Sequence, residues 1–360
     1  MRRRDSGFSL LELLLAIGIL GLVLSAAITF FTAVVRQYKV QTKITETNVE
    51  GVIGLEILRQ DLESLGFGLP WNNMVSYNEA ASGRLNDSTT SAPRAVVSVE
   101  TPSYTVNNSD YLVVKSARVG MSGAAGKWTT LSSTGAKRDW RDAGGDLLPD
   151  ENFSNTDTVI VLSPGNSDAS WRSLVAPGGT FSVTYGGASG SGYPPLESFD
   201  TNLVYGIDAQ TLRMPFNRAD YYIDNTALTV PRHCAPVTGT LVKRVVRHSD
   251  GTLDDPLPLL DCAADMQVVY GLDSDADGQV DTWSHDISTG MTAADIRIQL
   301  LEVRLHVLAQ EGQRDDSYRP PTDNVFVGSE GVGRNFNLVL YRNYRWKLYT
   351  IVVKPTNLAR

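Results

Sequence analysis

The feature that most limits how this chain can fold is an apolar run near its N-terminus. Residues 8–35 carry a single formal charge, that of Glu12. As an α-helix rising about 1.5 Å per residue, this run would be about 42 Å long. The hydrocarbon core of a bilayer is only about 30 Å thick, and the apolar core of a signal peptide has only about 7–15 residues. The sequence therefore predicts a transmembrane helix over residues 8–35.

The charges before this run predict its orientation. Arg2, Arg3 and Arg4 precede it, and positive residues flanking a span stay on the cytoplasmic side. The rest of the chain would follow the span to the other face. We therefore expect a single-pass membrane protein with a cytoplasmic N-terminus and its body on the opposite face.

Glu12 is out of place in a plain membrane anchor, because an ionised carboxylate inside a bilayer costs at least about 2–3 kcal/mol. It belongs, however, to the stretch Gly7-Phe8-Ser9-Leu10-Leu11-Glu12, which resembles the type IV prepilin cleavage and methylation site. The resemblance implies that residues 1–7 are a leader, that a prepilin peptidase cuts after Gly7, and that Phe8 is N-methylated. It also implies that Glu12 pairs with a free N-terminal amine, of a neighbour or of its own chain.

The same resemblance implies the partners of the chain. These would be the prepilin peptidase, other major and minor pilins through the N-terminal helix, and the inner-membrane assembly platform. The assembled protein would lie in the pilus at the cell surface. Many major pilins carry a proline partway along this helix, and residues 8–35 contain none, which favours a minor pilin or a pseudopilin.

The helix is expected to continue beyond the membrane. Over residues 36–66 apolar residues recur mostly every three or four positions, ending with Leu55, Leu58, Leu62 and Leu65. This spacing is typical of one buried helical face. Glycine and proline residues at 66–70 then end the pattern. Residues 36–66 are thus predicted to be an amphipathic continuation that packs on the body of the protein.

Residues 67–360 are predicted to form a β-rich domain. Short β-prone runs alternate with Gly-, Asn-, Ser- and Pro-rich turns, and no long crossover helices separate them, so the sheets should be mostly antiparallel. The fold class is therefore α+β, with a long N-terminal helix packed on an antiparallel sheet. Trp71–Pro93 and Gly186–Pro195 are expected to be surface loops. The expected strands cover residues 95–99, 111–115, 158–162, 181–185, 202–207, 221–223, 240–246, 266–272, 296–308, 337–341 and 347–353.

Three stretches of the body extend the resemblance. They are RQDLESLGF (59–67), VVYGLDSDADGQVDTW (268–283) and IRIQLLEVRLHVLA (296–309). Their order resembles the PilW family of minor pilins, which implies a role in pilus assembly or initiation, near the tip. Two alternatives stay open: a J-type pseudopilin of type II secretion, and a tip adhesin whose loops bind a surface.

One stretch has the composition of a calcium loop. Asp273, Asp275, Asp277, Gln279 and Asp281 follow the pattern D-x-D-x-D-G-x-x-D. Calcium takes six to eight oxygen ligands, and alternate carboxylates on a tight loop converge on one point. Position twelve of the loop is a serine, so a full EF-hand is not expected. We predict a structural Ca²⁺ site that closes a β-hairpin or a loop excursion, against the alternative of a solvated acidic turn without an ion.

The cysteine count and the charge bound the remaining possibilities. Cys234 and Cys262 are the only cysteines, and in an exported chain they favour one disulfide over two buried thiols. The net charge of −8 argues against nucleic acid as a partner. The four histidines are scattered and no nucleophile is paired with a base, so we expect a protein that is not an enzyme.

Overall fold

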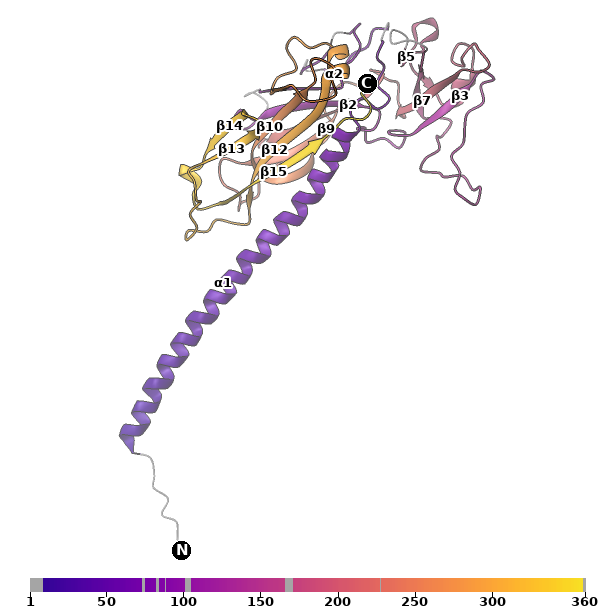
Figure 1. Cartoon of the computed structure of the whole chain (residues 1–360). Coiled ribbons are helices and arrows are strands. Elements are labelled where there is room, and N and C mark those ends of the chain that lie inside the picture. The colour runs from indigo at the N-terminus through magenta and orange to yellow at the C-terminus, as the bar shows by residue number, and fades with distance from the viewer. Residues whose placement is uncertain are drawn as a thin grey trace.

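The computed structural model describes residues 9–72, 75–81, 84–87, 89–100, 105–165, 171–226 and 228–358, without the side chains of residues 40, 46–48 and 50. Its longest element is the helix α1 (Leu10–Glu63), which extends well beyond the rest of the molecule (Figure 1). Ser9 caps α1: its hydroxyl accepts the Glu12 N–H, and the Glu12 carboxylate accepts the Ser9 N–H. This reciprocal pair is a capping box.

The two halves of α1 have opposite environments. Residues 9–34 are exposed, whereas Leu55, Leu58 and Leu62 are buried against the body. Gly54 permits the close approach, because an added Cβ there would lie 1.8 Å from the carbonyl oxygen of Leu259. A glycine is therefore needed where α1 crosses the strand that contains Leu259.

The main sheet receives the buried face of α1. Its strands follow the order β1-β2-β8-β9-β10-β12-β15, with the short β11 paired to β10. Each of these pairs is antiparallel. The long central strand β10 contributes residues to the same hydrophobic core as the buried leucines of α1. The bounds are β1 (Val96–Glu100), β2 (Asp110–Ser116), β8 (Asn217–Asp224), β9 (Gly239–Val245), β10 (Leu257–Leu272), β11 (Thr282–Ser284), β12 (Leu300–Glu311) and β15 (Arg345–Val353).

A smaller sheet lies beside the main one, on the right in Figure 1. Its order is β3-β7-β4-β5, with β6 paired to β4, and it encloses a separate apolar cluster that includes Leu131, Val161 and Val204. The bounds are β3 (Trp128–Ser132), β4 (Thr158–Ser163), β5 (Ser173–Leu174), β6 (Val183–Thr184) and β7 (Thr201–Asp208).

The remaining elements are short. The hairpin of β13 (Asn324–Ser329) and β14 (Val332–Asn337) packs Val327 and Phe336 against the main sheet. The helix α2 (Ala293–Gln299) leads into β12. The 3₁₀ turns are η1 (Pro177–Gly179), η2 (Gly186–Ser189) and η3 (Val339–Tyr341).

This architecture confirms the α+β class and the antiparallel sheets. Three strand predictions are wrong in part. Of residues 181–185 only β6 is a strand, because Tyr185 adopts a helical conformation that leads into η2. Residues 296–299 belong to α2, because the Thr292 hydroxyl and the Asp295 carboxylate form a capping box that starts a helix there. Residues 339–341 form η3, and the strand of that region is β14, which ends at Asn337.

The expectation that Trp71–Pro93 is a surface loop is also wrong in part. Within its described residues, Tyr77, Glu79 and Ala80 are buried. The Tyr77 ring packs edge-on against Phe216, with centroids 5.5 Å apart. The segment therefore contributes Tyr77 and Ala80 to the hydrophobic core and also buries the charged Glu79.

Candidate functional site

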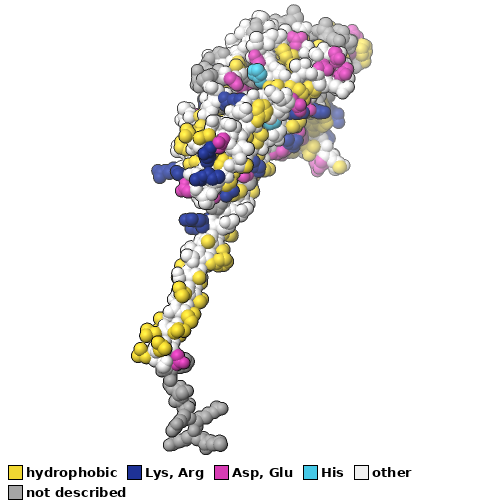
Figure 2. Space-filling model, turned by 60° about the vertical axis from the view of Figure 1, so that its left-hand side comes forward, with side chains coloured by type: hydrophobic (Ala, Val, Ile, Leu, Met, Phe, Trp, Pro, Cys, Tyr) yellow, Lys and Arg dark blue, Asp and Glu magenta, His cyan; other side chains and the backbone are white. Residues whose placement is uncertain are grey.

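The projecting part of α1 is an apolar surface that no other described residue of the chain covers. Leu10–Thr45 is long and apolar enough to cross a membrane, with a mean hydropathy of 2.6 over its most apolar window, none of which is buried. Figure 2 shows hydrophobic side chains spread along this part of the helix. Large exposed apolar surfaces mark contacts with membranes or with other proteins. The predicted cleavage residues Gly7 and Phe8 lie outside the described residues.

Glu12 lies at the exposed start of this surface. Its carboxylate accepts the Ser9 backbone N–H at 3.0 Å, so in this structure it serves the helix N-terminus. The amide that donates is the one formed with residue 8. If the mature chain began at residue 8, its N-terminal amine would lie one residue before the Ser9 N–H that Glu12 binds here.

A buried ion pair fixes the other end of α1 to the main sheet. Asp61 accepts hydrogen bonds from the Lys243 ammonium at 2.7 Å and from the Tyr221 hydroxyl at 2.5 Å. Burial raises the pKa of Asp61, and the charge of Lys243 acts in the opposite direction. A buried carboxylate is tolerated only with such partners, so this contact specifies where the helix docks.

The acidic loop forms the turn of a β-hairpin between β10 and β11. One carboxylate oxygen from each of Asp273, Asp275 and Asp281 lies within 4.8 Å of the others. Oxygens bound to one Ca²⁺ at about 2.3–2.6 Å lie no more than about 5 Å apart. These three residues therefore have the spacing of ligands to a single cation.

Asp277, a fourth predicted ligand, is arranged differently, and the predicted role of Gln279 stays a prediction. The Asp277 carboxylate is not part of this group and accepts the Gln279 N–H at 2.7 Å. Gly278 has φ of +86°, which a glycine adopts without strain. The Asp273 carboxylate accepts the Gly278 N–H at 2.9 Å, so backbone donors help to shape the loop.

The two cysteines are joined. Cys234, in the connection between β8 and β9, forms a disulfide with Cys262 of β10, and the two Cα atoms are 5.1 Å apart. His233 lies beside this pair. The sulfur atoms are bonded to each other, so this group is not a metal site.

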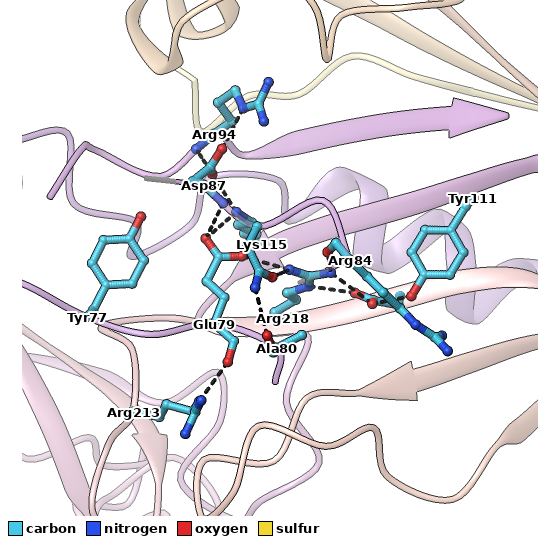
Figure 3. A network of polar contacts seen from close by, with 12 residues as sticks. Tyr77, Glu79, Ala80, Arg84, Asp87, Arg94, Tyr111, Lys115, Arg213 and Arg218 are labelled. Carbon is cyan, nitrogen blue, oxygen red and sulfur yellow. Dashed lines mark hydrogen bonds and ion pairs between the residues drawn. The ribbon is translucent and has the colours of Figure 1, made fainter. Parts of the chain in front are cut away.

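A network of buried charges was not predicted from the sequence (Figure 3). Glu79 binds the Lys115 ammonium of β2 and the Arg218 guanidinium of β8, each at 2.8 Å, and these three side chains are at most 1% exposed. Arg218 also binds Asp220 at 2.7 Å, and Lys115 also binds Asp87. Burial works to raise the pKa of Asp87, but Lys115 and Arg94 outweigh it, so this pKa is lowered.

The network ties Glu79 and Asp87 to the main sheet, and its buried charges are paired with one another. A signal was present in the sequence. Lys115 ends the apolar run of the predicted strand 111–115, and Arg218 lies three residues before the predicted strand 221–223; a charge on a buried strand requires a buried partner.

The comparisons with known proteins agree with this geometry. Residues 220–357, from β8 to just past β15, match the family described as type IV pilus-assembly protein W. Residues 2–28, which include Glu12, match the prokaryotic N-terminal methylation motif. The searches of curated proteins and of solved structures found no match. The exposed apolar helix, the methylation motif and the PilW match identify this chain as a type IV prepilin-like protein, a minor pilin of pilus assembly.

Proposed function

We propose that this minor pilin is inserted in the inner membrane through α1, with residues 1–7 in the cytoplasm and the body in the periplasm. The prepilin peptidase cuts after Gly7 and methylates Phe8, and the assembly platform then moves the mature chain into the pilus. The single observation that carries this proposal is the exposed apolar half of α1. Outside lipid, that surface is stable only when other helices cover it.

We place the subunit near the pilus tip. Its body combines the main sheet, the smaller sheet and the β13–β14 hairpin. A subunit that repeats around every turn of a fibre must fit between identical neighbours, and a rare terminal subunit has no such limit. Antibodies against the body should label pilus ends, and labelling along the shaft would contradict this placement.

We propose that Glu12 sets the position of the subunit by pairing with a free N-terminal amine. A buried charge is tolerated when paired and is strongly destabilising when it is not. The bond between the carboxylate and the Ser9 N–H supports this role, since it holds the carboxylate beside the start of the mature chain.

Mass spectrometry of the protein purified from cells that express the peptidase tests the processing. The expected mature chain starts with N-methylated Phe8, and an intact Met1 would overturn the proposal. Two variants separate the roles of Glu12: Glu12→Gln keeps an acceptor for the Ser9 N–H and removes the charge, whereas Glu12→Ala removes both. Both should be processed normally and fail to enter pili; normal incorporation of Glu12→Gln would contradict charge pairing.

We further propose that the acidic loop binds Ca²⁺ in a structural role and that the protein has no catalytic activity. The spacing of Asp273, Asp275 and Asp281 supports the calcium site. An ion that binds only the folded state raises the melting temperature by mass action. Melting should shift upward in millimolar CaCl₂ relative to EGTA. Asp275→Asn should abolish this shift, and equal melting curves for the parent protein in the two buffers would contradict it.

A further inference from the structure

A cleft of about 890 Å³ lies where the smaller sheet meets the main sheet. Leu203 of β7, Leu301 of β12, the tip of the acidic loop and the segment after β15 all contribute to its walls. Its size is within the range of about 300–1,000 Å³ that ligand sites occupy. The assembly role of α1 does not use it.

The charge of this cleft differs from that of the whole chain. The protein has a formal net charge of −8. Among the described residues, the charged side chains that line the cleft are Arg172 and Lys354, and no carboxylate lines it. The acidic loop contributes Gly278, Gln279 and Val280 but none of its aspartates. A positively charged cleft on an acidic protein favours an anionic ligand.

One nitrogen of the Arg172 guanidinium is hydrogen-bonded to the protein, and its other two nitrogens can donate to a ligand. Its Nη1 donates to the carbonyl oxygens of Gly66 at 3.1 Å and Asn357 at 2.9 Å. Within the described part of the chain, Nε and Nη2 have no hydrogen-bond partner. That same edge of a guanidinium binds a carboxylate elsewhere in this protein: Arg334 reaches Asp265 through Nε at 2.9 Å and Nη2 at 2.6 Å.

The backbone also holds Arg172 in an unusual position. Its φ is +46°, a left-handed conformation that is uncommon for residues other than glycine. Its carbonyl oxygen accepts the Trp71 N–H at 3.1 Å. Burial lowers the pKa of Arg172, and the nearby charge of Arg297 lowers it further. An anion in the cleft would offset the repulsion between Arg172 and Arg297.

The aromatic residues favour a peptide over a sugar. The guanidinium groups of Arg172 and Arg297 lie over the Trp71 ring, 4.6 and 4.4 Å from its centroid. Trp171 is 37% exposed, with its centroid 5.8 Å from that of Trp71 in a tilted arrangement. A sugar stacks on an open ring face, whereas the aliphatic and tryptophan walls suit an apolar side chain.

We propose that this cleft binds an acidic peptide segment of a partner protein, with the carboxylate on Nε and Nη2 of Arg172 and a neighbouring apolar side chain against Trp171 and Leu203. Lys354 adds attraction at the rim. The proposal goes beyond the assembly role of α1 and does not depend on it.

The test is titration calorimetry on the full chain in detergent with two matched probes, N-acetyl-Phe-Asp-amide and N-acetyl-Phe-Asn-amide. A charged, two-fold hydrogen bond should make the Asp peptide bind at least about tenfold more tightly than the Asn peptide. Arg172→Lys keeps the charge and loses the planar pair of donors, so it should remove most of this preference. Arg141→Lys, at an exposed ion pair with Asp139, is the matched control and should bind like the parent protein.

Circular dichroism melting establishes that Arg172→Lys is folded, and Lys354→Gln, at an exposed position, gives a second variant with an expected loss of a few-fold. Absence of saturable binding, equal affinity for the two peptides, or full preference retained in Arg172→Lys would each overturn the proposal. So would tighter Arg172-dependent binding of galacturonate, which would assign the cleft to an acidic sugar.

Discussion

The projecting half of α1 and the body of the protein are built in opposite ways. Along residues 9–34 the helix exposes leucine, isoleucine and phenylalanine side chains. The body does the reverse and buries charged side chains such as Glu79, Lys115 and Arg218, the last two on strands β2 and β8 of its main sheet. One region presents apolar groups to its surroundings, and the other encloses ionic groups within itself.

The difference shows where each region finds its partners. The buried charges of the network around Glu79 are paired with one another within the described part of the chain. The apolar face of α1 has no such partners among the described residues, and its stability must come from lipid or from other pilins. The assembly surface and the folding core of this protein are therefore largely separate.

The largest expected effect comes from breaking the buried network. Arg218→Met removes the guanidinium that binds Glu79 and Asp220. Two buried carboxylates then lose a partner, which typically destabilises by about 3–5 kcal/mol. Chemical denaturation of the body should show this loss as a lower midpoint.

The matched control is Arg247→Met, which breaks the exposed pair between Arg247 and Asp254. Exposed pairs contribute little, so no measurable change is expected. Equal effects of the two substitutions would show that the buried network is not what stabilises the body.

A second prediction uses pH to probe a buried carboxyl. Burial raises the pKa of Asp110 to about 7, whereas its ordinary value is 3.8. The folded state therefore holds an extra proton between about pH 4 and 7, and the contribution of Asp110 to stability falls as pH rises through this window. Asp110→Asn cannot ionise, so its stability relative to the parent should rise by up to about 4 kcal/mol from pH 4 to 7.

Comparison of the two proteins isolates this contribution. His248, whose pKa burial lowers to about 4 from 6.5, acts in the opposite direction, because the unfolded state binds the extra proton between these values. It is present in both proteins and cancels in the difference. Denaturation at four or five pH values measures the slope, and parallel curves would contradict the expected titration of Asp110.

A third prediction concerns the disulfide of the body. Cys234 and Cys262 are 28 residues apart in sequence, and closing a loop of this length stabilises by about 3 kcal/mol in the chain-entropy estimate. The double variant Cys234→Ala/Cys262→Ala should therefore unfold at a lower denaturant concentration than the oxidised parent protein. The parent in dithiothreitol should match the variant; an unchanged midpoint in both would show that the cross-link does not restrain the unfolded chain.

The sequence predicts well the features whose signal is local. The helix and its two environments follow from an apolar run and a three- to four-residue spacing, and the acidic loop from alternate aspartates. The strands β13 and β14 were missed because glycine and asparagine residues break their alternation. The helix α2 was missed because Ile296 and Ile298 read as part of the strand that follows.

The buried network and the cleft were not predictable in this way. Glu79 lies 36 residues from Lys115 and 139 from Arg218, and no local pattern indicates which distant charge will pair with it. Arg172 is positioned for binding only because the carbonyl oxygens of Gly66 and Asn357 accept hydrogen bonds from its Nη1. Such sites form where segments far apart in the sequence come into contact in the fold, and the spacing of apolar residues does not predict which segments these are.

The smallest expected change in stability comes from a substitution in the exposed half of α1, and it is compared with one in the buried half. Leu14 is 61% exposed and Leu58 is fully buried, yet both are leucines of α1. Leu58→Ala removes core packing and should destabilise the body by about 2–5 kcal/mol. Leu14→Ala should change the free energy of unfolding of the body by less than about 0.5 kcal/mol, because its side chain touches no part of the core.

Pili isolated from cells test the role of this face in assembly. If they lack the Leu14→Ala protein while its body melts like the parent, the apolar face of α1 serves assembly alone. A lowered melting temperature would instead show that this half of the helix also supports the fold.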